Sequence, residues 1–135
     1  MNLTIDTFAW LEVIRGTPAG ATAQSAMLGA EESLTPSIVL AEVAGACHRT
    51  GLTDDQVAQE LAAIREASTI VPIDDSVAIS AVHRLDELRS RARQRRLALP
   101  GIGDALILAT AREHRARLLT GDPHFQDLPE TVWIQ

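Results

Sequence analysis

The sequence predicts an α/β protein in which helices cover both faces of a parallel β-sheet. Short apolar segments alternate along the chain with longer segments of helical periodicity, which is typical of βαβ units. Hydrophobic residues make up 46% of the 135 residues, enough for a core without disulfides or metals as staples. The chain shows no internal repeat, low-complexity tract or linker. We therefore expect one domain over residues 1–135.

The first elements follow from an apolar run and the capping residues behind it. Leu3–Ile5 is apolar and ends at Asp6, as expected of a buried strand. Asp6 and Thr7 can cap a helix over Phe8–Arg15, in which apolar residues recur on one face. A second helix is expected over Ala19–Ala30.

A third helix is predicted from a proline near its start. Ser33–Thr35 is expected to form a brief strand or turn. Thr35 then resembles an N-cap and Pro36 the first helical residue, where the missing N–H of proline costs nothing. The helix should run to about Thr50, and Gly51 should end it.

The rest of the chain is expected to alternate in the same way. Aligned apolar residues and suitable starting residues predict the helices Asp54–Ala67, Asp74–Arg93 and Gly103–Glu113. Short apolar runs predict the strands Thr69–Val71, Ala116–Thr120 and Thr131–Ile134. Proline and glycine indicate the loops Gln94–Ile102 and Gly121–Asp127.

The composition excludes several classes of protein. Cys47 is the single cysteine, so no internal disulfide is expected, which fits a reducing cytoplasm. We expect a cytoplasmic protein, since neither a signal peptide nor a membrane-spanning apolar run is visible. All twelve basic residues are arginine, and the absence of lysine excludes a P-loop and a Schiff-base enzyme. The net charge of −6 argues weakly against nucleic-acid binding by the whole surface.

Three aspartates stand where a parallel sheet places functional groups. Asp6 and Asp122 each follow a predicted strand, and Asp104 opens a helix. Taken alone, each is also an ordinary helix cap or turn residue. In open parallel sheets, however, ligands bind outside the carboxyl ends of the strands. The three side chains are therefore expected to share one edge of the sheet.

Glu42 is the one charged residue of Ser37–Cys47, and it lies about two turns into its helix. Helical spacing surrounds it with small and apolar neighbours, which are Ile38, Val39, Gly45 and Ala46. A buried ionised carboxylate is costly unless it is paired or metal-bound. Pairing with Arg49 is one explanation for Glu42, and a place in a metal pocket is the other.

Carboxylates that converge on one edge repel one another unless a cation neutralises them. A set of oxygen ligands without a His or Cys cluster suits a hard divalent cation such as Mg²⁺ or Mn²⁺. Such an ion keeps several waters and leaves room for a phosphate oxygen. The chemistry that fits is phosphodiester hydrolysis with metal-activated water as the nucleophile.

Four motifs carry a resemblance to a known family. In chain order they are IDTFAW, PSIVLAEV, DALILATA and LLTGDPHF. Over essentially its whole length the chain resembles a PIN-domain ribonuclease, most closely the VapC-type toxins of toxin–antitoxin pairs. The resemblance implies an α/β/α sandwich with a central parallel sheet, RNA cleavage, a homodimer, and inhibition by an antitoxin protein.

The resemblance also implies which residues form the site. The acidic pocket would consist of Asp6, Glu42, Asp104 and Asp122. Mg²⁺ (or Mn²⁺) would be held by Asp6, Asp104 and Asp122, with Glu42 binding directly or through a water.

Three further residues are expected to support the pocket. Thr7 and Thr120 match hydroxyl positions that often line such pockets. His124 departs from the family pattern, because many relatives carry a further acid there. This departure puts a full second metal site in doubt. His124 could contact phosphate instead, or it could be a plain loop histidine.

An arginine-rich run precedes the loop at 94–102. Arg84–Arg96 holds six Arg against Asp86 and Glu87, a local charge of +4. Arg91, Arg93 and Arg95 could contact RNA phosphates or an acidic antitoxin segment. A solvated helix end is the alternative, since arginine is favoured near a helix C-terminus.

Three other functions compete with RNA cleavage. The first is a catalytically silent PIN-like module that binds RNA or another protein. The second is a deoxyribonuclease relative, although those are usually longer chains. The third is a phospho-accepting receiver domain, which also gathers acids at a sheet edge but needs the lysine that this chain lacks.

Overall fold

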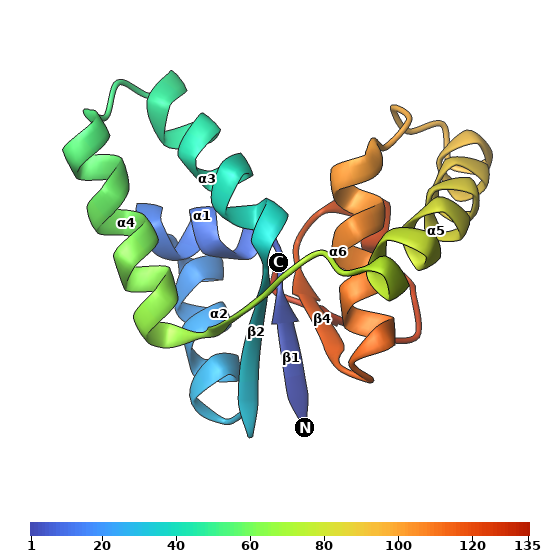
Figure 1. The fold of residues 1–135 in the computed structure, drawn as a ribbon, viewed down its shortest axis with the longest axis horizontal. Coiled ribbons are helices and arrows are strands. Elements are labelled where there is room, and N and C mark those ends of the chain that lie inside the picture. The colour runs from blue at the N-terminus through green and yellow to red at the C-terminus, as the bar shows by residue number, and fades with distance from the viewer.

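The protein, described over residues 1–135 by a computed structural model, is built around one five-stranded parallel sheet (Figure 1). The strands are β1 (Asn2–Ile5), β2 (Glu32–Pro36), β3 (Thr69–Val71), β4 (Arg117–Thr120) and β5 (Thr131–Trp133). They lie in the order β3-β2-β1-β4-β5, and every neighbouring pair is parallel. The helices are α1 (Thr7–Arg15), α2 (Pro18–Leu28), α3 (Ser37–Arg49), α4 (Asp54–Ala67), α5 (Asp75–Gln94) and α6 (Ile102–Glu113), with a short 3₁₀ turn η1 (Pro123–Phe125).

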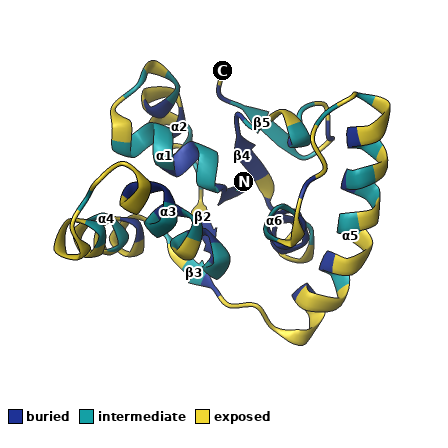
Figure 2. Cartoon of the chain, turned by 90° about the horizontal axis from the view of Figure 1, so that it is seen from above, coloured by how far each residue is buried: buried dark blue, intermediate teal, exposed yellow.

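The helices form two layers on opposite faces of the sheet. Seen from above, α1 to α4 lie on one face, and α6, backed by α5, lies on the other (Figure 2). This arrangement confirms the predicted α/β/α sandwich with a parallel sheet. It also brings α3 and α6, which cover opposite faces, into contact with each other.

The sheet order places two of the acidic residues at adjacent strand ends. β1 is the central strand and pairs with β4, so that Ile5 lies beside Leu119. Asp6 follows β1 directly, and Asp122 follows β4 after one glycine. Both carboxylates therefore stand at the carboxyl edge of the sheet, as expected of a functional edge.

The core holds the helix that carries Asp104 in place. One cluster of 18 buried residues fills the space between the sheet and both helical layers, and Phe125, Leu3 and Leu108 are fully buried within it. A smaller cluster, with Val77 and Ala105 among its members, joins α5 to α6. All seven residues of Ala105–Ala111 are buried. Since close-packed interiors yield little, α6 is a rigid support for the residues at its start.

The start of the third helix differs from the prediction. Thr35 is not its N-cap: β2 continues through Pro36, which is itself the cap residue of α3 and contributes no side-chain cap. The hydroxyl of Thr35 is buried and accepts a hydrogen bond from Trp10 Nε1 at 3.0 Å. A tertiary contact, invisible in the local sequence, thus uses the side chain that the cap would have needed.

The other elements were predicted to within about two residues of their ends, which is where helix assignments ordinarily differ. α2 starts and ends slightly earlier than expected, and α6 starts at Ile102. The loop predicted after β4 contains the turn η1. None of the helices combines the length and apolar character needed to cross a membrane.

Candidate active site at the carboxyl edge of the sheet

Asp6 is the most deeply buried of the four acids. It is the N-cap of α1, and its Oδ1 accepts a hydrogen bond from the Ala9 backbone N–H at 2.8 Å. Its Oδ2 accepts one from the Thr120 hydroxyl. The residue is 1% exposed, so water does not solvate its charge. Burial raises the pKa of Asp6 from 3.8 to about 7, against the two hydrogen bonds and with further help from Asp122 and Asp104.

Asp104 lies in the first turn of α6 and faces the other acids. Burial raises its pKa from 3.8 to about 6, and repulsion from Asp122 and Glu42 adds to this shift. His124 acts in the opposite direction. This repulsion indicates that the start of α6, the turn after β4 and α3 bring their carboxylates near one another.

Glu42 is held by a hydroxyl rather than by an arginine. Its Oε1 accepts a hydrogen bond from the Thr7 hydroxyl at 2.6 Å. No ion pair joins it to Arg49, whose guanidinium lies beside Gly45. Neutralisation by Arg49 is therefore not the explanation for this half-buried carboxylate.

Thr120 connects two of the acids through a single hydroxyl. It donates to Asp6 and accepts from the backbone N–H of Asp122 at 2.9 Å. A hydroxyl can do both at once, so its donor and acceptor capacities are both used. This bond ties the turn after β4 to the end of β1.

His124 bridges Asp122 to the loop between α5 and α6. Its backbone N–H donates to Asp122 Oδ1 at 2.9 Å, and its ring Nδ1 lies 3.0 Å from the same oxygen. Its Nε2 lies 2.6 Å from the carbonyl oxygen of Ala98. Burial lowers the pKa of His124, but the Ala98 carbonyl and the Asp122 carboxylate outweigh burial and raise it overall. Two oxygen acceptors on the two ring nitrogens favour the imidazolium form.

The carboxylates lie close enough to repel one another but do not form a ready-made metal cage. No three His, Cys, Asp or Glu side chains are spaced to hold an ion by themselves. Mg²⁺ does not require such a cage, because it keeps several waters and binds through one or two carboxylates. The donor set is all oxygen, and two of its carboxylates have raised pKa values, which fits a hydrated hard cation.

The three arginines singled out in the sequence differ in their surroundings. Arg91 donates to the Gln126 carbonyl at 2.7 Å, and Arg95 donates to the Pro123 carbonyl at 2.8 Å. Both therefore brace the turn that follows Asp122. Arg93 is exposed. A contact between these arginines and a partner stays a prediction, and Arg93 is the one whose guanidinium is free of such a bond.

Sequence reasoning missed two participants in the pocket. Gly103 was predicted only to start a helix after a glycine-containing loop, yet its backbone lies against the carboxylate of Glu42. A glycine directly before a candidate site aspartate was the available signal. Ala98 contributes through its carbonyl oxygen, for which a side-chain pattern offers no signal at all.

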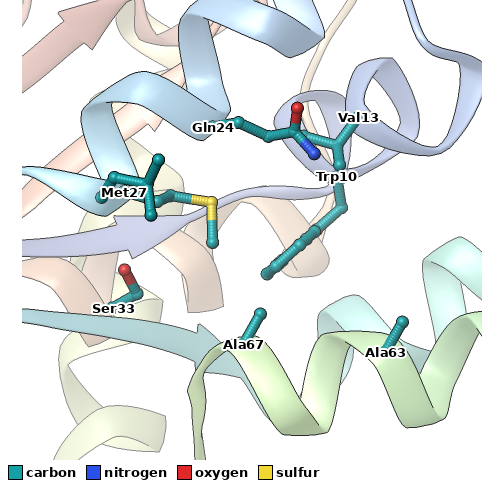
Figure 3. A pocket seen from close by; sticks show the side chains of 8 residues that line it. Trp10, Val13, Gln24, Met27, Ser33, Ala63 and Ala67 are labelled. Carbon is teal, nitrogen blue, oxygen red and sulfur yellow. The ribbon is translucent and has the colours of Figure 1, made fainter.

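A separate apolar groove lies between α1, α2 and α4. Its cavity volume is about 590 Å³, and none of the four acids lines it. The Trp10 ring points into it from α1, opposite Ala67 of α4 and near Met27 of α2 (Figure 3). Leu28, 89% exposed, stands at its margin. The groove is apolar, in contrast to the cluster of acids at the carboxyl edge of the sheet.

The parallel sheet and the acids at its carboxyl edge agree with the protein family that the sequence matches. The family model of the PIN domain matches residues 3–130, and the chain belongs to the PIN-domain family. Among curated protein sequences, none matches the chain significantly.

Solved structures with the same fold include components of toxin–antitoxin systems. A toxin–antitoxin complex from Klebsiella pneumoniae is 22% identical, covers 98% of both chains and has a TM-score of 0.72. VapBC2 from Rickettsia felis, bound to a promoter DNA fragment, is 19% identical, with a TM-score of 0.67 and coverage of 98% and 97%. VapC20 from Mycobacterium tuberculosis, described as a sarcin–ricin loop cleaving toxin, is 16% identical, with a TM-score of 0.63 and 86% coverage of both chains. At these identities the likeness concerns the fold.

Proposed function

We propose that the chain is a divalent-metal-dependent endoribonuclease and the toxin of a VapBC-type toxin–antitoxin pair. The observation that carries the proposal is the gathering of Asp6, Glu42, Asp104 and Asp122 at the carboxyl edge of a PIN-domain sheet. Two of these acids have raised pKa values, which is typical of functional sites. The sarcin–ricin loop cleaving toxin among the similar structures supports a cleavage activity, and RNA is the substrate that we propose.

Mg²⁺ or Mn²⁺ is the cofactor that fits the pocket best. Asp6, Asp104 and Asp122 would hold the ion, and Glu42 would bind it directly or through a water. When bound, the ion supplies Lewis-acid stabilisation of phosphate charge and lowers the pKa of a bound water.

The protein's own residues orient the carboxylates for this task. Thr120 and the Ala9 N–H fix both oxygens of Asp6, and Thr7 fixes one oxygen of Glu42. His124 holds Asp122 and brings its imidazole ring beside the acids, where it can also meet a phosphate. Such preorganised groups need little rearrangement when charge develops on the substrate.

The proposed partners are an antitoxin and a second copy of the chain. The similar structures include toxin–antitoxin complexes, which supports an antitoxin for this chain. The apolar groove lined by Trp10, Met27 and Leu28 offers such a partner a surface for apolar side chains. An exposed concave apolar surface of this kind is typical of an interaction site.

A catalytically silent module is the second candidate. One observation favours it: His124 stands beside Asp122 as a cationic partner, where many PIN relatives carry a further acid. A histidine that neutralises Asp122 would reduce the need for a metal ion.

The decisive experiment is cleavage of RNA by the purified protein with and without Mg²⁺ or Mn²⁺. We expect cleavage that depends on the metal and falls by about a hundredfold or more in Asp104→Asn and Glu42→Gln, since even residues behind metal ligands commonly contribute 10–100-fold. Asp86→Asn, an exposed acid on α5, is the matched control and should cleave like the wild type. Wild-type cleavage by Asp104→Asn would contradict the proposed site, and metal-free RNA binding without cleavage would favour the silent module.

A further inference from the structure

Gly103 faces the carboxylate of Glu42 at a distance that leaves no room for a side chain. A Cβ added to Gly103 would lie 2.7 Å from Glu42 Oε2 and 3.4 Å from its Cδ. Cβ atoms in proteins essentially never come within 3.0 Å of a non-bonded heavy atom, so one of the two groups would have to move. The group that can move is the flexible end of Glu42, because the backbone of α6 is anchored by the buried run Ala105–Ala111 that follows Gly103.

The other side of the same carboxylate is held by α1. The Thr7 hydroxyl donates to Oε1 at 2.6 Å, while Oε2 lies against Gly103. Three elements, α1, α3 and α6, thus enclose Glu42 between a donor and a bare backbone. This gap between the Thr7 hydroxyl and the Gly103 backbone is the slot that the Glu42 carboxylate occupies.

Other closely packed glycines in the chain serve the fold instead. A Cβ on Gly20 would collide with the backbone of Glu12, and one on Gly121 would collide with the ring of Phe8. At Gly103 the nearest atoms all belong to a side chain that the proposed reaction uses. The contact therefore distinguishes Gly103 from glycines that only allow close packing.

We propose that Gly103 is a positioning residue: its lack of a side chain opens the slot through which Glu42 reaches the pocket beside Asp104. The inference rests on the proposed function for its effect on metal binding, but not for its effect on the position of Glu42. Gly103→Ala should push the carboxylate out of the slot and break its bond to Thr7, while the helix itself accepts alanine readily.

Gly101→Ala is the matched control. Gly101 lies two residues earlier in the same segment, and a Cβ there would meet no atom within 4 Å. Its backbone is extended, with φ at −99°, so alanine fits without strain. The two variants add the same methyl group to neighbouring positions and differ in what that group meets.

The first measurement is a crystal structure of each variant without metal. In Gly103→Ala we expect the Glu42 carboxylate to be displaced and its hydrogen bond to Thr7 to be broken. In Gly101→Ala both should be the same as in the wild type. A Glu42 carboxylate that keeps its place in Gly103→Ala overturns the proposal. A Gly103→Ala protein that does not fold overturns it too, because Gly103 would then serve the fold.

The second measurement is Mn²⁺ affinity by calorimetry. Gly103→Ala should weaken binding about tenfold or more, as is common when the support of a metal ligand is removed, and Gly101→Ala should not. Adding Glu42→Asp to Gly103→Ala shortens the acid by one methylene and should restore part of the affinity. An equal loss in Gly103→Ala with Glu42 already replaced by alanine would overturn the proposal, because the effect would not pass through Glu42.

The proposed function and the positioning role of Gly103 can be disproved separately. If the wild type binds no Mn²⁺ and cleaves no RNA, the proposed function fails, while displacement of Glu42 in the Gly103→Ala crystal still supports the positioning role. If the wild type binds and cleaves and Gly103→Ala does so equally well, the proposed function stands and the role of Gly103 is overturned.

Discussion

Carboxylates at the two ends of α6 lie in opposite electrostatic surroundings. At its start, Asp104 meets other acids, and burial with their repulsion raises its pKa to about 6. In its last turn, Arg112 donates to both oxygens of Glu87, at 2.7 and 3.0 Å, and to Glu130 at 2.8 Å. The hydrogen bonds from Arg112 lower the pKa of Glu87.

The two ends of α6 therefore differ in role: its start belongs to the candidate active site, and its last turn stabilises the fold. The cluster of Arg112, Glu87 and Glu130 satisfies its charges internally and joins α6 to α5 and to the segment before β5. The acidic site receives hydrogen bonds but no arginine, and burial with mutual repulsion disfavours the ionised forms of Asp6 and Asp104, which costs stability and leaves capacity for a cation. One rigid helix, buried over Ala105–Ala111, carries both.

The largest effect is expected from removing the charge of Asp6 in the absence of metal. Its pKa is 3.8 when unfolded and about 7 when folded, so between these values the folded protein binds a proton that the unfolded chain has released. The contribution of Asp6 to stability therefore falls as pH rises through this window, by up to roughly 4 kcal/mol. Asp6→Asn should gain stability over the wild type at pH 7.5 but little at pH 4.5, measured by urea unfolding in EDTA. A pH-independent difference would show that Asp6 is ionised throughout.

A bound metal ion should offset the destabilisation caused by the buried carboxylates. It should not affect the cluster of Arg112, Glu87 and Glu130 at the other end of α6. At a concentration about 100 times its Kd, Mg²⁺ or Mn²⁺ should stabilise the wild type by about 2.7 kcal/mol. The increase in Tm over an EDTA sample should disappear in Asp104→Asn and persist in Arg112→Ala. Equal stabilisation of both variants would place the ion elsewhere on the protein.

Arg112→Ala should lower stability without touching the reaction. It leaves two partly buried glutamates without their shared partner, which we expect to cost about 2 kcal/mol in urea unfolding. Cleavage per folded molecule should stay unchanged, and Arg65→Ala, at an exposed arginine of α4, should change neither stability nor cleavage by much. A loss of cleavage in fully folded Arg112→Ala would mean that the two ends of α6 are coupled.

The smallest effects concern the arginines of α5. Arg91→Gln and Arg95→Gln each remove bonds to the turn after Asp122 and should cost about 1 kcal/mol in thermal unfolding. Arg93→Gln should leave stability unchanged and lower the salt dependence of RNA binding by about one phosphate contact. Identical salt dependence in Arg93→Gln and the wild type would exclude that contact.

Much of the fold could be predicted because its local signals agree with one another. Leu3–Ile5 and Ala116–Thr120 are short, largely apolar runs that favour buried strands, and Asp6 and Asp122 come just after them. Parallel strands then require that their carboxyl ends meet, so Asp6 and Asp122 could be expected at one edge. The prediction failed at Thr35, where the bond from Trp10, a residue of α1, draws the hydroxyl into the sheet.

For the acidic site too, local signals could be predicted from the sequence and contacts between elements could not. Nothing local distinguishes Arg91, which braces a turn, from Arg93, which is exposed. Nothing local shows that His124 reaches the Ala98 carbonyl or that Gly103 makes room for Glu42. These contacts join residues from different elements, and their geometry follows from how the layers pack.

By itself, the sequence determined the α/β class and the order of the elements and singled out the four acids as candidates, because period, capping and strand-end chemistry are local properties. The tertiary structure alone decided the surroundings of those acids: that Asp6 is buried, that Asp104 lies near Asp122 and Glu42, and that Glu42 lies between Thr7 and Gly103. The physical reason is that burial, repulsion and steric room depend on distances between elements that only the packed sheet and helices define.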